Sequence, residues 1–170
     1  MKPVPEPLPL FFNRDLSLLA FNARVLAQAA DAAMPLLERL RFLCIFSSNM
    51  DEFFMKRVGY LKRLLATGAA RTGHDNVAPA ATLDRIHAEI GRLFDERARL
   101  WRDELRPQLA AAGIPTLDWA DLNPAERDQA ADFFREQVFP VLTPLAVDPS
   151  HPFPFLSNQS LSLGVRLKAP

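Results

Sequence analysis

Apolar residues recur at helical spacing along the first 109 residues, and this pattern constrains the fold more than any other feature of the sequence. Residues three or four positions apart lie on one face of a helix, so each such run predicts a helix with one buried side. The first run is Leu16, Leu19, Ala20, Ala23, Leu26 and Ala27. Comparable runs follow over residues 35–46, 51–65 and 82–109. The sequence therefore predicts an N-terminal bundle of about four helices.

Residues with strong preferences at helix ends set the expected boundaries of the first three helices. Asn13 or Asp15 can cap the first helix, and Pro35 suits the first position of the second. The Ser-Ser-Asn run at 47–49 favours helix ends over helix interiors, because these short side chains compete for backbone hydrogen bonds. We therefore expect the second helix to stop there and a third helix to begin near Asp51.

The fourth and longest helix carries end signals of its own. Residues 68–81 are mostly small and include glycine, asparagine and proline, which is typical of a loop, so Thr82 is expected to cap the helix that follows. Proline has no amide hydrogen, so Pro107 predicts a kink or an early end. Gly113 stands where a glycine commonly closes a helix.

The pattern changes after Gly113. The Asn-Pro-Ala-Glu run at 123–126 predicts a helix start with a cap, a proline and a capping box. Five prolines between 140 and 154 exclude regular structure, and the alternation over 160–168 predicts a half-buried strand. A single strand cannot pair its own edges, and no earlier segment offers a partner. We therefore expect a truncated chain in which a second domain has only begun.

Composition excludes several classes of function. Twenty Lys and Arg balance twenty Asp and Glu, which argues against a dedicated nucleic-acid binder. The single cysteine, Cys44, cannot form an internal disulfide or a thiolate zinc cluster, and it favours a reducing, cytoplasmic location. No apolar run is long enough to predict a membrane span. His74, His87 and His151 lie too far apart in the sequence to predict a histidine-rich metal site.

A polar cluster stands at the expected junction between the second and third helices. It consists of Ser47, Ser48, Asn49, Asp51 and Glu52. Helix capping explains such residues, because acids in a first turn suit the helix dipole. The alternative is a ligand site. The two acids disfavour a bare phosphate there, whereas the asparagine amide donates and accepts hydrogen bonds and suits the edge of a base or sugar.

A basic run follows this cluster. Between Phe53 and Gly73 the chain has five cations and no acidic residue: Lys56, Arg57, Lys62, Arg63 and Arg71. A solvated helix face explains this run, and a patch that attracts a polyanion or nucleotide is the alternative. Arg57 lies about two helical turns beyond Asn49, so both side chains are able to border one cleft.

Three separated segments resemble, in order, the hallmark motifs of the bacterial long-form polyphosphate kinases. The resemblance spans residues 11–168, with Leu18 departing from a position where tryptophan is common. The segments are FNRDLSLLAFNARVL at 12–26, PLLERLRFL at 35–43 followed by IFSSNMDEFF at 45–54, and FPVLTPLA at 139–146 with Asp148 and HPFP at 151–154.

The resemblance implies an enzyme that reversibly transfers the terminal phosphate of ATP to inorganic polyphosphate through a phosphohistidine, with magnesium assisting. It also implies a fold: mainly α, an N-terminal helical bundle followed by the truncated start of an α/β head domain. Residues 1–12 are then a proline-rich lead, 13–113 the N-terminal helical domain and 114–170 the incomplete head domain. In this family the phosphorylated histidine and the magnesium ligands lie in C-terminal domains related to the phospholipase D fold.

One functional residue transfers by position. The family contacts ATP through the asparagine before its Asp-Glu-Phe segment, which is Asn49 here. Asp51 and Glu52 are read as structural caps, and no role transfers to Arg57. We expect no catalytic residue and no metal ligand in this chain, and no kinase activity from the chain alone. The partners implied are ATP or ADP, polyphosphate, the remaining domains of the same polypeptide and a second copy of the full-length enzyme, but no nucleic acid.

Two further interpretations stay open at this point. One is a free-standing, non-catalytic helical interaction module. The other is a polyanion-binding module that uses Lys56, Arg57, Lys62 and Arg63. Some members of the resembling family associate with membranes, although no amphipathic anchor stands out in this sequence.

Overall fold

The computed structural model describes residues 11–68 and 77–168. The chain divides into two compact units, Met1–Pro115 and Thr116–Pro170, and each is described by itself. The described residues are mainly helical, as the sequence predicts. The greater part of the expected loop over 68–81 lies outside the described residues.

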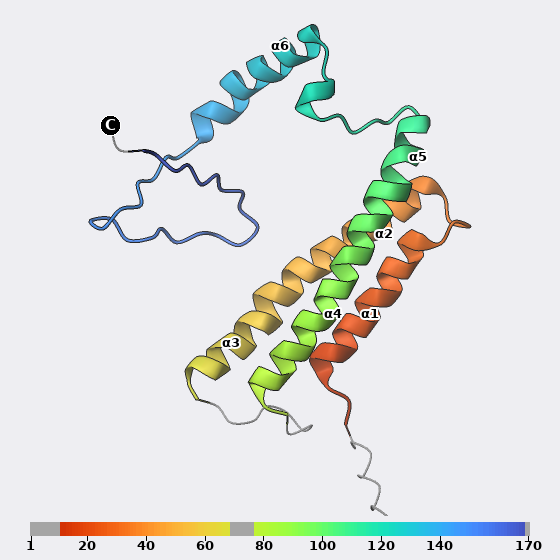
Figure 1. The fold of residues 1–170 in the computed structure, drawn as a ribbon, viewed down its shortest axis with the longest axis vertical. Helices are drawn as coiled ribbons and strands as arrows, with labels where there is room; N and C mark the ends of the chain where they lie inside the picture. The colour runs from red at the N-terminus through yellow and green to blue at the C-terminus, as the bar shows by residue number, and fades with distance from the viewer. Residues whose placement is uncertain (1–10, 69–76, 169–170) are drawn as a thin grey trace, which may run out of the picture. The chain divides into compact units, whose positions relative to one another are not determined.

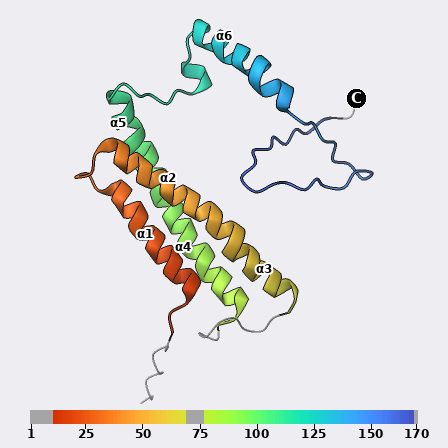
Figure 2. The same cartoon turned by 180° about the vertical axis from the view of Figure 1, so that it is seen from behind.

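Three long helical rods form the first unit (Figures 1 and 2). The first is α1 (Arg14–Ala30). The second runs from α2 (Leu36–Phe53) through the π-helical η1 (Phe54–Val58) into α3 (Gly59–Ala66). The third runs from α4 (Pro79–Arg99) through the π-helical η2 (Leu100–Leu105) into α5 (Arg106–Ala111). α1 packs against both α2 and α4, and α3 packs against α4.

The expected break at 47–49 is wrong, because α2 continues through it into η1 and α3. The polar atoms of these residues find partners without ending the helix. Ser47 Oγ donates to the Leu43 carbonyl oxygen at 2.9 Å, and the Asn49 amide bonds to a side chain on α1. The prediction of caps at Asp51 and Glu52 is therefore also wrong, since both lie inside a continuous rod. The bundle has three rods rather than about four helices.

Other helix ends follow the sequence more closely. Asn13, not Asp15, caps α1, and its Oδ1 accepts from the amides of Asp15 and Leu16 at 3.0 Å. Gly113 has φ +81°, and the Ile114 amide donates to the Leu109 carbonyl oxygen at 2.8 Å, which completes a Schellman motif.

Two expected boundaries shift. α4 begins at Pro79 with Ala78 as its N-cap, so Thr82 is not a cap and lies buried in the first turn. Proline already suits this first turn, because its missing amide hydrogen has no helical partner there. The rod also continues past Pro107, which follows the π-helical η2. A wider turn before the proline gives room for its ring.

Apolar side chains fill the space between the three rods. Burying such side chains is the main stabilising contribution to a bundle of this size. The fully buried large ones are Leu19, Leu26, Phe46, Met50, Leu61, Ile86, Leu93, Leu100 and Leu105. They come from every rod, so the first unit has one continuous core.

The second unit contains η3 (Trp119–Asp121), α6 (Pro124–Phe133), η4 (Phe134–Val138) and η5 (Phe139–Val141). The predicted capping box of α6 is confirmed by reciprocal bonds between Asn123 and Glu126. The predicted strand over 160–168 is wrong, because no strand forms among the described residues. Without a partner to complete a ladder, its apolar side chains stay exposed, with Leu161 94% accessible.

Candidate functional site

Asn49 lies in the interior of α2, on the side that faces α1. Its Nδ2 donates to Asn22 Oδ1 on α1 at 2.8 Å. Asn22 is buried, and its own Nδ2 donates to the Leu18 carbonyl oxygen at 2.9 Å. Asn49 itself is half-buried, so part of the residue reaches the surface. The asparagine singled out from the sequence is thus tied to a second, buried asparagine.

These two bonds fix which way the Asn49 amide points. A backbone carbonyl only accepts, so the Asn22 atom facing Leu18 must be the donor nitrogen. Asn22 therefore presents its oxygen to Asn49, and Asn49 must donate a hydrogen bond to that oxygen from its own amide nitrogen. Among the described residues, no hydrogen bond to Asn49 Oδ1 is formed, and this oxygen is not one of the buried polar atoms that lack a partner, so it is open to solvent. The arrangement leaves a fixed acceptor at the edge of the bundle, next to one remaining amide hydrogen.

Arg57 contacts α1 on the same side. Its Nε donates to Asp15 Oδ1 at 2.6 Å and its Nη2 to Asp15 Oδ2 at 3.3 Å. Asp15 is buried, and this hydrogen bond raises the pKa of Arg57 above its ordinary value. The guanidinium also lies over the Tyr60 ring, 5.4 Å from its centre. Asn49 and Arg57 thus share one helix interface, but the Arg57 charge is already matched by a carboxylate.

A third polar contact crosses the same two helices. Arg39 on α2 is buried, and its Nε donates to the Ala29 carbonyl oxygen at the end of α1 at 2.8 Å. The other guanidinium nitrogens reach the third rod, where they bond to Glu104 at 2.9 Å and to Gln108 at 3.2 Å. We call the contacts Asp15–Arg57, Asn22–Asn49 and Ala29–Arg39 the polar seam.

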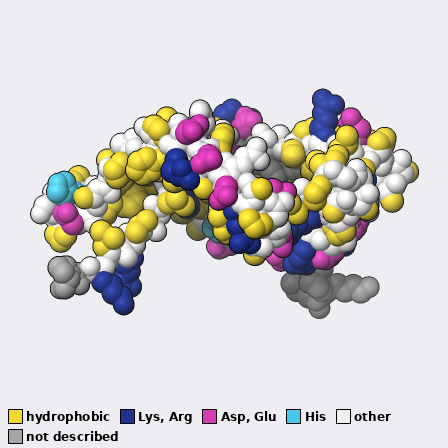
Figure 3. Space-filling model, turned by 90° about the horizontal axis from the view of Figure 1, so that it is seen from above, with side chains coloured by type: hydrophobic (Ala, Val, Ile, Leu, Met, Phe, Trp, Pro, Cys, Tyr) yellow, Lys and Arg dark blue, Asp and Glu magenta, His cyan; other side chains and the backbone are white. Residues whose placement is uncertain are grey.

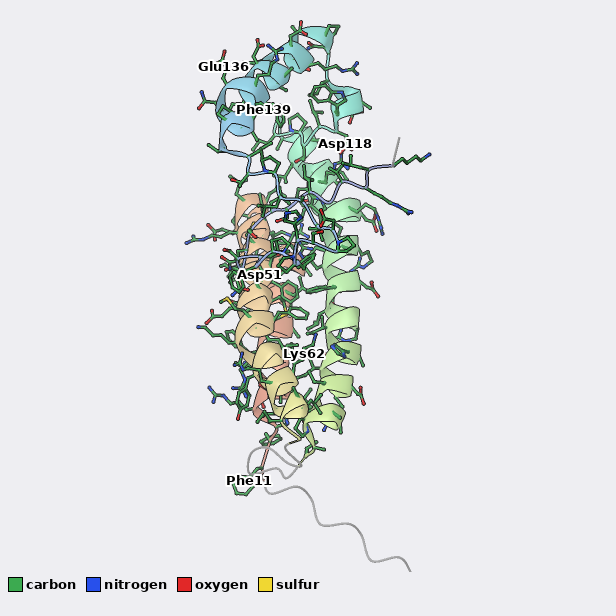
Figure 4. The ribbon with its side chains drawn as sticks, turned by 90° about the vertical axis from the view of Figure 1, so that its left-hand side faces the viewer. Phe11, Asp51, Lys62, Asp118, Glu136 and Phe139 are labelled. Atoms are coloured by element: carbon green, nitrogen blue, oxygen red, sulfur yellow. The ribbon has the colours of Figure 1, made fainter. Side chains whose placement is uncertain are left out.

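The remaining members of the predicted polar cluster point elsewhere. Ser47 faces α4 and accepts from Arg97 Nε at 2.9 Å. Ser48, Asp51 and Glu52 are exposed, and Glu52 pairs with Lys56 one turn later. Figure 4 shows Asp51 on α2 and Lys62 further along the same rod. The structure therefore does not assemble the cluster into one site, and only Asn49 belongs to the polar seam.

Half of the described basic run is paired with acidic residues. Lys56 and Arg57 pair with Glu52 and Asp15, respectively. Lys62 and Arg63 are exposed, and neither has an acidic partner within the described residues. Arg71 lies outside those residues. On the face in Figure 3, basic and acidic side chains are interspersed.

A separate groove of about 550 Å³ lies between α2 and the third rod. Trp101 and Arg97 line it, together with Cys44 and Ser47 from α2. Arg102, also in the lining, is paired with Asp103 at 2.7 Å. Asn49 is not part of this lining, so the groove and the candidate site are different features.

Within 11–68 and 77–168, no group of three or more His, Cys, Asp or Glu side chains is placed to hold a metal ion. No described helix combines the length and the hydrophobicity needed to cross a bilayer.

Sequence reasoning missed Asn22 and Arg39. A signal for Asn22 was available: with Asp15 it stands seven residues apart on the apolar face of one helix. Polar residues at such positions are costly unless they are paired, which makes them candidates for specific contacts. Arg39 gave a similar signal, because it stands on the apolar stripe of its helix, four residues before Leu43 and seven before Phe46.

Two family models match the chain. Residues 11–117 match the polyphosphate kinase N-terminal domain, and residues 125–170 match the polyphosphate kinase middle domain. The two matches together cover most of the sequence.

Individual relatives give the same result. The chain is 52% identical to the polyphosphate kinase of Mycobacterium marinum and 51% identical to that of Mycobacterium ulcerans, each over 164 residues. These matches cover 96% of this chain but 22% of each relative, so the chain spans about a fifth of their length. A crystal structure of polyphosphate kinase from Porphyromonas gingivalis is similar with a TM-score of 0.73 and 34% identity, over 89% of this chain and 21% of that one.

Proposed function

Because the chain belongs to the polyphosphate kinase family, we propose that it forms the N-terminal part of a longer enzyme that reversibly transfers the terminal phosphate of ATP to inorganic polyphosphate through a phosphohistidine. In this proposal, residues 13–113 are the N-terminal helical domain and residues 114–170 begin the head domain. The chain supplies part of the nucleotide site, and the nucleophile comes from another part of the polypeptide.

The observation that supports a nucleotide role is the fixed orientation of the Oδ1 atom of the half-buried Asn49. A single neutral acceptor of this kind suits the polar edge of a base better than a phosphate, which needs donors or positive charge. The nearest cation of the polar seam, Arg57, is already bonded to Asp15. We therefore assign Asn49 to the base end of ATP rather than to its phosphates.

Phosphoryl transfer depends mainly on positioning and charge stabilisation. This chain contributes to positioning, since a base held at Asn49 limits how the rest of the nucleotide is presented. The described residues hold no carboxylate cluster that fits magnesium, so no step through the metal is assigned to them. We propose that the metal ligands and the polyphosphate site lie in other parts of the enzyme. We also propose that those other parts contribute to the contact with a second subunit. The cytoplasmic location stays a prediction.

The test is Asn49→Ala in the longer protein, with ATP-dependent polyphosphate synthesis as the measurement. Losing one or two neutral hydrogen bonds should raise the KM for ATP about 5- to 10-fold, with a smaller change in kcat. Ser48→Ala is the matched control, because Ser48 is the exposed neighbour outside the polar seam. An unchanged KM for Asn49→Ala would remove the nucleotide role from this site.

The purified 170-residue chain should show no turnover of ATP and polyphosphate. Turnover from this chain alone would mean that the nucleophile lies within it, which would contradict the proposal.

A further inference from the structure

We propose that Asn22 is a positioning residue that holds the Asn49 amide in one orientation and thereby makes the site select adenine over guanine. This inference rests on the proposed function, because it names the base that the same site prefers. Asn22 is too deeply buried to contact a ligand directly. Its effect on the nucleotide is exerted through Asn49.

The Asn22 amide cannot turn over without loss. Its Nδ2 donates to the Leu18 carbonyl oxygen, four residues earlier on α1, at 2.9 Å. A half-turn of the amide would place Asn22 Oδ1 against that carbonyl, so two acceptors would face each other in a buried position. An unsatisfied buried polar group is costly, and the surrounding helices exclude water that might replace the lost bond.

The fixed Asn22 in turn fixes Asn49. With Asn22 Oδ1 facing it at 2.8 Å, Asn49 keeps a bond only when it presents Nδ2. The reverse orientation would again oppose two oxygen atoms. Both amides are therefore ordered by one backbone carbonyl. The atom that this series of hydrogen bonds leaves open to solvent is the Asn49 oxygen. A lone asparagine on the surface would turn freely and offer either atom.

A fixed acceptor distinguishes the two purines. Adenine carries an exocyclic amino group beside a ring-nitrogen acceptor, which matches an asparagine that accepts through Oδ1 and donates through its remaining amide hydrogen. Guanine carries a carbonyl oxygen at the corresponding position. That oxygen would face Asn49 Oδ1, and the pairing would be lost. Nucleobase pairs of this kind typically discriminate by about 10-fold or more.

The experiment compares ATP and GTP as phosphoryl donors for the longer protein, with KM and kcat measured for each. Asn22→Leu removes both polar atoms at similar volume and frees the Asn49 amide. We expect the KM for ATP to rise about 5-fold with kcat nearly unchanged, and the preference for ATP over GTP in kcat/KM to fall by a similar factor. A purely structural role would lower the efficiency with both nucleotides equally.

Two further variants sharpen the test. Asn22→Asp keeps an acceptor facing Asn49, so it should retain the preference for ATP, even though its second oxygen then opposes the Leu18 carbonyl and lowers the stability of the first unit. Thr82→Val is the control for a buried polar change, because Thr82 lies on α4 and its hydroxyl has no partner among the described residues. It should leave the ATP to GTP ratio unchanged.

The outcomes separate this inference from the proposed function. If Asn49→Ala weakens ATP use but Asn22→Leu leaves the preference intact, Asn22 does not position the amide and the nucleotide role stands. If Asn22→Asp loses the preference for ATP over GTP just as Asn22→Leu does, the inference is overturned. If neither Asn49→Ala nor Asn22→Leu alters the KM for ATP, the nucleotide role and the inference both fail.

Discussion

Arg57 on η1 donates two hydrogen bonds to the buried carboxylate of Asp15 at the start of α1, from Nε at 2.6 Å and from Nη2 at 3.3 Å. This pair is one end of the polar seam. Its α1 members, Asp15, Asn22 and Ala29, stand seven residues apart on the buried face. Polar contacts at such intervals set the register of two helices, because a slip would leave buried polar groups unpaired. The seam therefore fixes where Asn49 lies along α1.

Replacing Asp15 by asparagine should destabilise the first unit. The variant keeps the shape of the side chain but loses the charge that matches Arg57, and one amide nitrogen then faces a donor. Arg57 is partly exposed, so we expect a loss of about 1–2 kcal/mol in the free energy of unfolding. Urea unfolding followed by circular dichroism measures it.

Glu52→Gln is the control for Asp15→Asn. It removes a pair with Lys56 in which both side chains are more than half exposed. Exposed pairs contribute little, so the loss should stay below about 0.5 kcal/mol. Equal losses for the two variants would contradict a special role for the buried pair.

Replacing Arg39 by lysine should also be costly, although the charge is kept. The guanidinium bonds to Ala29, Glu104 and Gln108 on two neighbouring rods. A single ammonium group cannot reach all three, so at least one buried contact is lost. We expect a decrease of about 2 kcal/mol in the free energy of unfolding.

Arg41→Lys supplies the comparison on the same helix. The Arg41 side chain is 71% exposed and lies 3.7 Å from Glu38. Its replacement should change stability by less than about 0.5 kcal/mol. If Arg41→Lys lowered the free energy of unfolding as much as Arg39→Lys, the buried hydrogen bonds of Arg39 would add no stability beyond that of an exposed pair.

Alanine at two glycines should have opposite effects. Gly91 is exposed within α4, and an added Cβ meets nothing within 4 Å, so Gly91→Ala should stabilise the unit by about 0.5–1 kcal/mol. Gly113 has φ +81°, which strains any side chain, so Gly113→Ala should destabilise it by about 1 kcal/mol. Thermal melting of the two variants gives the signs. Stabilisation by Gly113→Ala would contradict the observed helix end.

Charge reversal at Lys62 and Arg63 tests the polyanion-binding alternative. Because Lys56 and Arg57 already have acidic partners, these two residues are the accessible cations of the described part of the run. We expect the double variant Lys62→Glu, Arg63→Glu to change the KM for ATP and polyphosphate retention less than 2-fold. Loss of polyphosphate retention in the double variant, together with retention by the unaltered protein that falls steeply as salt is added, would instead favour a polyanion-binding module.

Features set by residues within one helical turn were predictable from the sequence. The capping box at Asn123 and Glu126 and the helix end at Gly113 are both confirmed. In each case the hydrogen bonds join residues that are close in the chain. The first helix cap shows the limit of this reasoning. Asn13 and Asp15 are equivalent candidates in the sequence, but Asn13 caps the helix while the Asp15 carboxylate binds Arg57 on another rod.

Features that depend on distant partners were not predictable. Helix propensity is a weak signal that tertiary contacts override, and the run at 47–49 stays helical because Arg97 and Asn22 bond to Ser47 and Asn49. The alternation over 160–168 has the right pattern for a strand, but a strand needs a neighbour to pair with. The partner of Asn22 was not predictable for the same reason, since it lies 27 residues away, although the place of Asn22 on the apolar face of its helix marked it as a candidate.

The most direct test is a crystal structure of the longer protein with a non-hydrolysable ATP analogue bound. The account predicts that the adenine amino nitrogen lies within about 3.2 Å of Asn49 Oδ1, with the bond between Asn49 and Asn22 intact. An adenine bound away from Asn49, or an Asn49 amide turned so that Nδ2 faces the amino group, would contradict it.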